Sequence, residues 1–193
     1  MIPESQDLID LVRQTYAGIA EQPLQAHPIP NGRELAVQLG YPQKTLDSIS
    51  IASVQAYSGV SNVAQWTPIL PDQSVLDLGC GAGLDSLIAA SKGALVTGVD
   101  FCSSMLAVAR DAASSFQCKH PIDFRLAEAH KLPYPDHSFD IAMVNGLFNL
   151  NPSRAAIICE LFRVLKPGGN LYAAEIVRST KNSIEVTTDN WLA

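Results

Sequence analysis

The chain has 193 residues, of which 47% are hydrophobic and 17% charged, a composition typical of a globular domain with one sizeable core. Its formal net charge of -6, without any run of Lys or Arg, argues against a nucleic-acid partner and favours a small-molecule substrate. No apolar run approaches the roughly 20 residues of a membrane span, and the N-terminus lacks the features of a signal peptide, so we expect a cytoplasmic protein.

The first predicted element is an amphipathic helix over residues 5–20. Its apolar residues recur at helical spacing on one face, which carries Leu8, Val12, Tyr16 and Ile19. A helix with such an apolar stripe buries it against another part of the molecule. We therefore expect this helix to pack over the main domain.

The sequence between this helix and residue 70 predicts further helices and loops. Residues 22–32 are rich in proline and form a predicted loop, after which residues 33–39 and 44–57 have helical patterns. We expect residues 1–70 to form an N-terminal helical extension or lid. Residues 71–193 are then expected to form a separate α/β domain.

From residue 74 onward, predicted strands and helices alternate. The strands are expected near residues 74–79, 94–100, 122–127, 139–145 and 170–177. Helices are expected between them. This alternation predicts parallel βαβ units and a doubly wound, mostly parallel sheet.

The turn after the first predicted strand is the most informative local feature. Gly79, Gly81 and Gly83 alternate, and Asp77 precedes them in the strand. Glycine accepts a positive φ and, lacking a Cβ atom, lets backbone amides approach a ligand closely. The turn therefore predicts that a small molecule lies across it.

The glycine spacing differs from the dinucleotide fingerprint G-x-G-x-x-G, because Leu84 occupies the position of the third glycine. A pyrophosphate site is thus disfavoured, and a nicotinamide-dependent oxidoreductase is the less favoured alternative. Asp100 ends the second predicted strand, where an acid accepts hydrogen bonds from ribose hydroxyls in doubly wound sheets. Either Asp alone is equally compatible with a loop cap or a solvated charge.

Taken together, several segments resemble the class I S-adenosylmethionine-dependent methyltransferases, and the resemblance runs from about residue 10 to the end. The matching segments are Val75-Leu-Asp-Leu-Gly-Cys-Gly-Ala-Gly83, Gly98-Val-Asp-Phe101, Leu132-Pro-Tyr-Pro-Asp136 with Ser138-Phe-Asp140, and Arg163-Val-Leu-Lys-Pro-Gly-Gly169. The resemblance implies a Rossmann-like sheet, S-adenosylmethionine as the methyl donor and methyl transfer to a small molecule.

The resemblance also implies roles for residues of the first two motifs. Those expected to line the methionine moiety are Gly79, Cys80, Gly81 and Gly83. Asp77 would act through the donor's amino group or an ordered water, and Asp100 would hold the ribose hydroxyls. Phe101 and Met105 would flank the adenine, although core packing explains Met105 equally well.

Further roles are implied for residues of the later motifs. Glu128 stands where the family has an Asp that contacts the adenine amino group, and Ala129 would offer its backbone amide. Asn145 is assigned to the cofactor site. Gly146 and Asn149 are assigned to the substrate side, because the resembled enzymes place the acceptor after the fourth strand.

Two side chains have competing interpretations. Tyr16 is similar to tyrosines on N-terminal helices that cover the donor in quinone C-methyltransferases and arsenite methyltransferases, but a core tyrosine is the alternative. His130 could serve as a general base, since histidine is a common residue in that role, yet we favour a surface histidine. No residue is therefore assigned a catalytic role.

Within the family, the arsenite methyltransferase branch and the quinone C-methyltransferases are the most similar. Arsenite is nevertheless an unlikely substrate, because Ser86 and Gly146 replace cysteines that bind trivalent arsenic in that branch. The chain's four cysteines show no C-x-x-C pair and no metal-ligand spacing, so we expect free thiols and no metal.

The segment after the fifth strand is too short and polar for the antiparallel hairpin that closes the resembled sheet. We therefore expect that hairpin to be missing, with an exposed edge that a homodimer could cover. The alternative to a methyltransferase is a non-catalytic nucleoside-binding or interaction protein with a degenerate fold.

Overall fold

The computed structural model describes residues 5–177, while residues 1–4 and 178–193 lie outside the described part. One five-stranded sheet forms its centre, with the order β3-β2-β1-β4-β5 and every neighbouring pair parallel. The strands are β1 Ser74–Leu78, β2 Leu95–Asp100, β3 Asp123–Leu126, β4 Phe139–Asn145 and β5 Leu165–Ala174. The predicted doubly wound, Rossmann-like architecture is confirmed.

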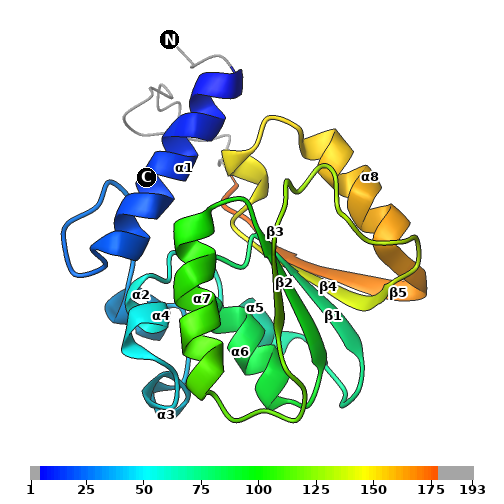
Figure 1. Ribbon diagram of the computed structural model, residues 1–193, viewed down its shortest axis with the longest axis horizontal. Coiled ribbons are helices and arrows are strands. Elements are labelled where there is room, and N and C mark those ends of the chain that lie inside the picture. Colours follow the sequence, from blue (N-terminus) through cyan, green and yellow to red (C-terminus); the bar gives the residue numbers. More distant parts are fainter. Residues whose placement is uncertain (1–4, 178–193) are drawn as a thin grey trace.

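Helices precede the sheet in the chain and then alternate with its strands (Figure 1). The α-helices are α1 Ser5–Glu21, α2 Arg33–Gln38, α3 Gln43–Asp47, α4 Ile51–Gln55, α5 Val63–Trp66, α6 Leu84–Ser91, α7 Ser103–Ser115 and α8 Arg154–Val164. A 3-10 turn, η1, spans Phe148–Leu150. None of the helices in residues 5–177 is long and apolar enough to cross a bilayer.

The sheet is covered on both faces, which explains why its central strands are almost continuously apolar. Side chains alternate between the faces along a strand. Val75 of β1 and Met143 of β4 join the hydrophobic cluster that contains α6. Leu76 and Leu78 of β1 join the cluster that contains α8 on the other side (Figure 1).

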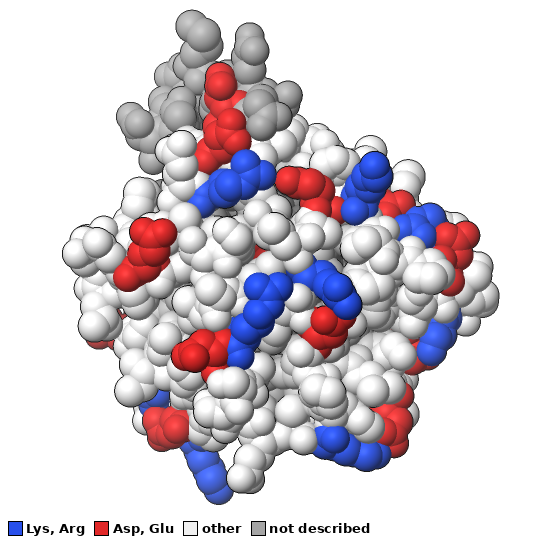
Figure 2. All heavy atoms as spheres, in the orientation of Figure 1, with Lys and Arg blue, Asp and Glu red and all other residues white. Residues whose placement is uncertain are grey.

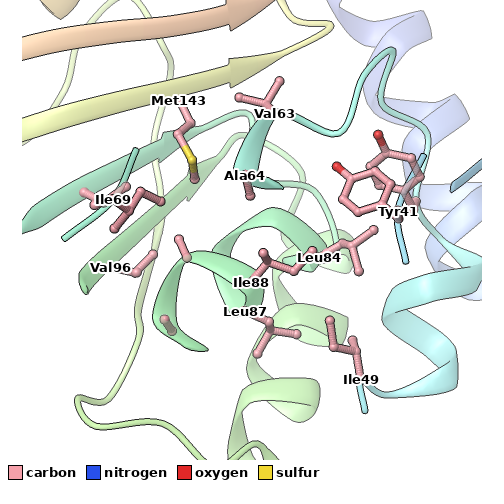
Figure 3. Close-up of a cluster of buried hydrophobic side chains, with 14 of the residues drawn as sticks. Tyr41, Ile49, Val63, Ala64, Ile69, Leu84, Leu87, Ile88, Val96 and Met143 are labelled. Atoms are coloured by element: carbon pink, nitrogen blue, oxygen red, sulfur yellow. The ribbon is translucent and has the colours of Figure 1, made fainter. Parts of the chain in front are cut away.

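The hydrophobic core continues across residue 70, the predicted boundary. Tyr41 and Ile49 from the N-terminal region belong to the same buried cluster as Leu84 of α6 and Met143 of β4. In Figure 3, Leu84 lies between Tyr41 and Met143. Burial of each large apolar side chain contributes about 1.5–3 kcal/mol. The N-terminal region is therefore held to the sheet by a shared core.

The predicted amphipathic helix is α1, and its apolar stripe is buried as expected. Leu8, Val12 and Ile19 are at most 4% exposed. Ile19 packs with Met105 of α7, and Figure 1 shows α1 lying across the upper end of α7. This position places α1 beside the ends of the central strands.

Two predicted elements differ from the structure. The predicted helix over residues 44–57 is divided into α3 and α4, because Ser50 between them has an extended backbone conformation with ψ 132°. Strand β5 begins at Leu165 rather than near residue 170, and a register irregularity opposite Phe139–Ile141 accommodates Gly168 at φ 81°. The prediction of a missing hairpin concerns residues beyond 177, outside the described part.

Charged side chains of both signs are interspersed on the face shown in Figure 2. Several form exposed ion pairs, such as Lys119 with Asp72 at 2.6 Å and Arg125 with Asp123 at 2.9 Å. Such exposed pairs contribute little to stability. The fold is therefore stabilised mainly by the core described above.

Candidate functional site

A cavity of about 990 Å³, counting its open mouth, lies at the carboxyl ends of β1, β2 and β4. Its lining residues come from these strand ends, from the glycine turn, from α1 and from residues 53–59. The order of the strands reverses between β1 and β4, and ligands bind at such switch points in open α/β sheets.

The glycine turn forms the floor of this cavity. Gly79, Gly81 and Gly83 have φ values of 77°, 51° and 85°, which other residues rarely adopt. A Cβ atom on Gly81 would meet nothing within 4 Å, whereas one on Gly79 would lie 2.7 Å from Leu147 Cδ1. The turn therefore needs glycine for its backbone conformation and, at Gly79, also for space.

Asp100 anchors the turn from the end of β2. Its two carboxylate oxygens accept hydrogen bonds from the amides of Gly81 and Cys102, each at 2.8 Å. Burial raises the pKa of this carboxyl, and the backbone amides oppose the rise. Asp100 lines the cavity, and each oxygen retains a lone pair that a ligand hydroxyl can use.

Asp77 lies deeper, in β1, and is 2% exposed. The Ser86 hydroxyl donates to its Oδ2 atom at 2.5 Å. Burial, followed by the charge of Asp85, raises the pKa of Asp77 to about 8. Asp77 is therefore largely protonated at neutral pH, and a cationic group bound beside it would favour the ionised form.

Helix α1 covers the cavity. Tyr16 lines it and has a pKa raised to about 12 by burial. Arg13 lies over the ring of Phe101, 5.1 Å from its centroid, and forms an ion pair with Glu128 at 3.2 Å. These contacts tie α1 to two of the predicted motifs.

The structure brings most of the predicted site residues together around this cavity. Those that line it are Tyr16, Asp77, Gly79, Cys80, Gly81, Asp100, Phe101, Met105, Ala129, Asn145 and Gly146. Three predicted residues, Gly83, Glu128 and Asn149, are not part of the lining. The roles assigned to all of them stay predictions.

The three residues outside the lining have other contacts. Gly83 precedes α6, where a Cβ atom would lie 3.0 Å from that of Ala109. Glu128 pairs with Arg13. Asn149 donates to Glu175 Oε1 at 3.1 Å and to Ile176 O at 2.6 Å, which joins η1 to the segment after β5.

The sequence reasoning missed the side of the cavity formed by residues from the N-terminal region and by α6. The missed lining residues include Ser53, Ala56, Tyr57, Ser58, Gly59 and Asp85. Segment 57–61, which we call the wall segment, has no recognisable motif. The one signal in the sequence was Asp85, an acidic residue in the first turn of α6. Residues 84–90 of this helix, Asp85 included, are all buried.

The lining has a clear charge character. It contains the carboxyl groups of Asp77, Asp85 and Asp100 and, among the described residues, no Lys, Arg or His. His130 is exposed on the surface, as favoured from the sequence. A cavity of this kind suits a cationic or neutral ligand better than a pyrophosphate.

Cysteine and metal chemistry find little support in residues 5–177. All four cysteines are free thiols, and burial raises the pKa of Cys80, the one that lines the cavity. In this part of the chain, no three His, Cys, Asp or Glu side chains are grouped so that they could hold a metal. Ser86, one of the two positions at which a cysteine was expected for arsenite binding, donates to Asp77.

Comparison with known proteins gives a consistent result. A family described as a methyltransferase domain matches residues 76–173. An arsenite methyltransferase of Halobacterium salinarum is 31% identical over 159 residues, covering 79% of this chain and 39% of that protein. A demethylmenaquinone methyltransferase of Tropheryma whipplei is 42% identical over 104 residues, covering 53% of this chain and 41% of that protein. The chain thus spans about two fifths of these curated relatives.

Solved structures show the same fold. The (4+2) cyclase SpnF superimposes with a TM-score of 0.62 at 27% identity, covering 90% of this chain and 60% of that one. The arsenic(III) S-adenosylmethionine methyltransferase CrArsM of Chlamydomonas reinhardtii gives a TM-score of 0.54 at 27% identity, covering 76% and 49%. The chain belongs to the methyltransferase domain family of class I S-adenosylmethionine-dependent enzymes.

Proposed function

We propose that this chain binds S-adenosylmethionine in the cavity and transfers its methyl group to a small-molecule acceptor. The observation that supports this most strongly is the glycine turn anchored by Asp100 at the switch point, inside a lining with three carboxyl groups and no basic side chain. The donor is a nucleoside with a sulfonium and an ammonium group, so the cavity's chemistry fits it.

Specific residues would hold the donor. Asp100 would accept hydrogen bonds from the ribose hydroxyls, and Asp77 would face the ammonium group, where a cation favours its ionised form. Phe101 and Met105 would supply apolar contact for the adenine, and Arg13 lies over the Phe101 ring. Glu128, engaged by Arg13, would contact the adenine edge only at the rim.

When bound, the donor supplies a methyl carbon on a positively charged sulfur, which an acceptor's lone pair attacks as the carbon–sulfur bond breaks and its electrons pass to sulfur. The protein's part is to position the two reactants and exclude water. Positioning alone can lower such a barrier by roughly 7–11 kcal/mol. Tyr16, on the covering helix α1, remains protonated because its pKa is raised to about 12. It therefore serves as a hydrogen-bond donor rather than a base.

Calorimetric titration tests donor binding. We expect S-adenosylmethionine and S-adenosylhomocysteine to release or absorb heat at micromolar to sub-millimolar concentrations, and NAD to give none. No heat and no thermal stabilisation with about 1 mM S-adenosylmethionine, which corresponds to binding weaker than about 4 kcal/mol, would refute the proposal.

A second function is binding without methyl transfer. It is favoured by SpnF, a protein named as a cyclase whose structure covers 90% of this chain. Formation of S-adenosylhomocysteine in a screen of phenol, thiol, amine and enol acceptors distinguishes the two. Product above the no-enzyme rate supports methyl transfer, and donor binding without product across the screen supports the second function.

We also propose that a second copy of the chain covers the sheet edge at β5. Strand β5 is an outer strand of the described sheet, and Leu171 and Ile176 near it are 41% and 61% exposed. Sedimentation velocity at micromolar concentration tests this. A dimer that dissociates when Leu171 is replaced by Lys is the expected result, and a monomer at all concentrations contradicts it.

A further inference from the structure

A cluster of five hydrogen-bonded residues lies on the N-terminal side of the cavity, with Tyr57, Asp85 and Asn145 in the lining, and the mechanism above gives none of the five an individual role. It consists of Asp85, Asn145, Tyr41, Tyr57 and Ser61, which come from α6, the end of β4 and the N-terminal region. Asp85 accepts from the Tyr41 hydroxyl at 2.6 Å and from Asn145 Nδ2 at 2.9 Å. At 6% exposure, Asp85 is buried and its carboxylate is satisfied within the protein.

Asn145 connects this cluster to the wall segment 57–61. Its Oδ1 atom accepts from the amides of Val60 and Ser61 at 2.9 Å and 3.1 Å, and its Nδ2 atom donates to Ser61 O at 2.6 Å. The side-chain amide thus pairs with the backbone as a neighbouring strand would. The orientation of this amide is fixed by Asp85, because a carboxylate can only accept from the Nδ2 group.

Gly59 allows the wall segment to approach the cluster closely. A Cβ atom at this position would lie 2.5 Å from the Tyr57 hydroxyl and 2.6 Å from Asn145 Nδ2, both below van der Waals contact. Its φ is not in the left-handed region, so the requirement is for space alone. The wall segment is therefore held against Asn145 at Tyr57, Val60 and Ser61, with Gly59 packed close to it.

The wall segment borders the donor side of the cavity. Tyr57, Ser58 and Gly59 all line it. Tyr16 of α1 and Asp100, the expected ribose-binding residue, line the same cavity. The wall segment therefore forms one boundary of the space in which the donor would lie.

We propose that Asp85 is a positioning residue that, through Asn145, holds the wall segment in the shape required for donor binding before the donor arrives. This inference rests on the proposed function. If the wall segment is already ordered, the donor does not lose binding free energy in ordering it. If the wall segment is loosened, only a fraction of the molecules can bind, and the apparent affinity falls in proportion to that fraction.

The physical consequence of changing Asp85 is specific. In Asp85→Asn the single amide oxygen cannot accept from both Tyr41 and Asn145, so the new NH2 group must face one of them. Either the Tyr41 hydroxyl changes from donor to acceptor or the Asn145 amide loses its acceptor, and both changes weaken the hold on Asn145. Tyr41→Phe removes one bond to Asp85 and one to Ser61 O at 3.1 Å. Since Tyr41 does not line the cavity, any effect of its change on ligand affinity passes through the cluster.

The test combines amide hydrogen exchange with calorimetry, using S-adenosylhomocysteine as the probe. In both variants we expect the amides of Val60 and Ser61 to exchange about 10-fold faster or more than in the wild type, and probe affinity to fall about 5–20-fold. Saturating probe should restore most of the exchange protection, because coupling between wall order and ligand is reciprocal.

A control separates positioning from general destabilisation. Thr67 is buried and its hydroxyl donates to Val63 O at 2.8 Å, outside the cluster. Thr67→Val should lower global stability while leaving both the exchange of Val60 and Ser61 and the probe affinity within twofold of the wild type. If the control changes affinity as much as Tyr41→Phe does, the effect is one of stability and the proposal is wrong.

Other outcomes also decide the matter. Unchanged exchange at residues 60 and 61 in Asp85→Asn and Tyr41→Phe overturns the positioning role. Faster exchange with unchanged probe affinity overturns its link to donor binding. A wild type that does not bind the probe refutes the proposed function, while the exchange data still show whether Asp85 holds the wall segment. If Asp85→Asn does not fold, Tyr41→Phe carries the test.

Discussion

The cavity has two sides that are built in different ways. The glycine turn, residues 79–83, is held by backbone conformation and by a carboxylate that binds its amides, with Gly81 and Asp100 only 19 residues apart. The wall segment 57–61 is held by side chains distant in sequence, since Asn145 is 84 residues from Ser61. The comparison teaches that a binding site can have one side fixed by a short motif and another fixed by long-range hydrogen bonds.

The largest effect on the turn is expected from Asp100→Asn. An asparagine has one acceptor oxygen, so it cannot satisfy the amides of both Gly81 and Cys102, and it lacks the charge for ribose hydroxyls. Charged hydrogen bonds contribute about 1.5–3 kcal/mol, so we expect S-adenosylhomocysteine affinity to fall roughly 100-fold in calorimetry. The exposed Asp72→Asn is the control, and an Asp100→Asn affinity within threefold of the wild type would contradict this role.

The next prediction concerns Lys92, which connects the N-terminal region to the end of α6. Lys92 donates to the carbonyls of Ala64, Gln65 and Thr67 at 2.6–3.2 Å, which fixes α5 against the end of α6. Lys92→Met should lower the free energy of unfolding by about 2–3 kcal/mol in urea titration. Probe affinity should stay within twofold, because Lys92 is not part of the cavity lining. The control is Lys131→Met, at an exposed lysine, which should change neither the free energy of unfolding nor the probe affinity. Equal losses of stability in the two variants would refute the role given to Lys92.

The stability of the protein should depend on pH through Asp77. Its pKa is about 8 in the folded state against 3.8 in the unfolded state, because of burial first and the charge of Asp85 second. Between these values the folded protein keeps a proton that the unfolded chain releases, so this contribution is complete below about pH 4 and is lost as the pH rises through about 8.

Urea titrations of the wild type and Asp77→Asn from pH 5 to pH 8 measure this contribution. The wild type should lose stability with rising pH relative to the variant, by up to about 1.4 kcal/mol per pH unit. Parallel curves for the two proteins would show that Asp77 does not bind the proton.

The smallest effect is expected for the contact that joins α1 to the motif side. Arg13 and Glu128 are 41% and 39% exposed, and exposed ion pairs contribute about 0.2–1 kcal/mol. Arg13→Ala should therefore lower probe affinity only about two- to threefold, and 1 M NaCl should weaken the wild type toward the variant. Arg125→Ala, which breaks another exposed pair, should change nothing. A tenfold loss in Arg13→Ala would mean that α1 is held mainly by this contact.

The sheet and the glycine turn could be predicted because local rules determine them. Alternating strand and helix patterns predicted the five strands, and glycine readily accepts the positive φ values found at Gly79 and Gly81, which other residues rarely adopt. The family resemblance added the ligand class. These features depend on residues close together in the sequence.

The wall segment and the hydrogen-bond partners of two motif residues could not be predicted in this way. Asn145, assigned to the donor site, lines the cavity, but its pairing with Val60 and Ser61 forms only in the folded chain. Asn149, assigned to the substrate side, donates to Glu175 after β5. The roles assigned to both residues stay predictions, and the partners of each side chain depend on tertiary contacts.

The account depends most on which molecule lies against the glycine turn. A crystal structure grown with S-adenosylhomocysteine tests this directly. We expect its ribose hydroxyls within hydrogen-bonding distance of Asp100 and its amino acid end beside Gly79 and Gly81. A cavity left empty at saturating ligand, or the nucleoside bound elsewhere on the protein, would contradict the account.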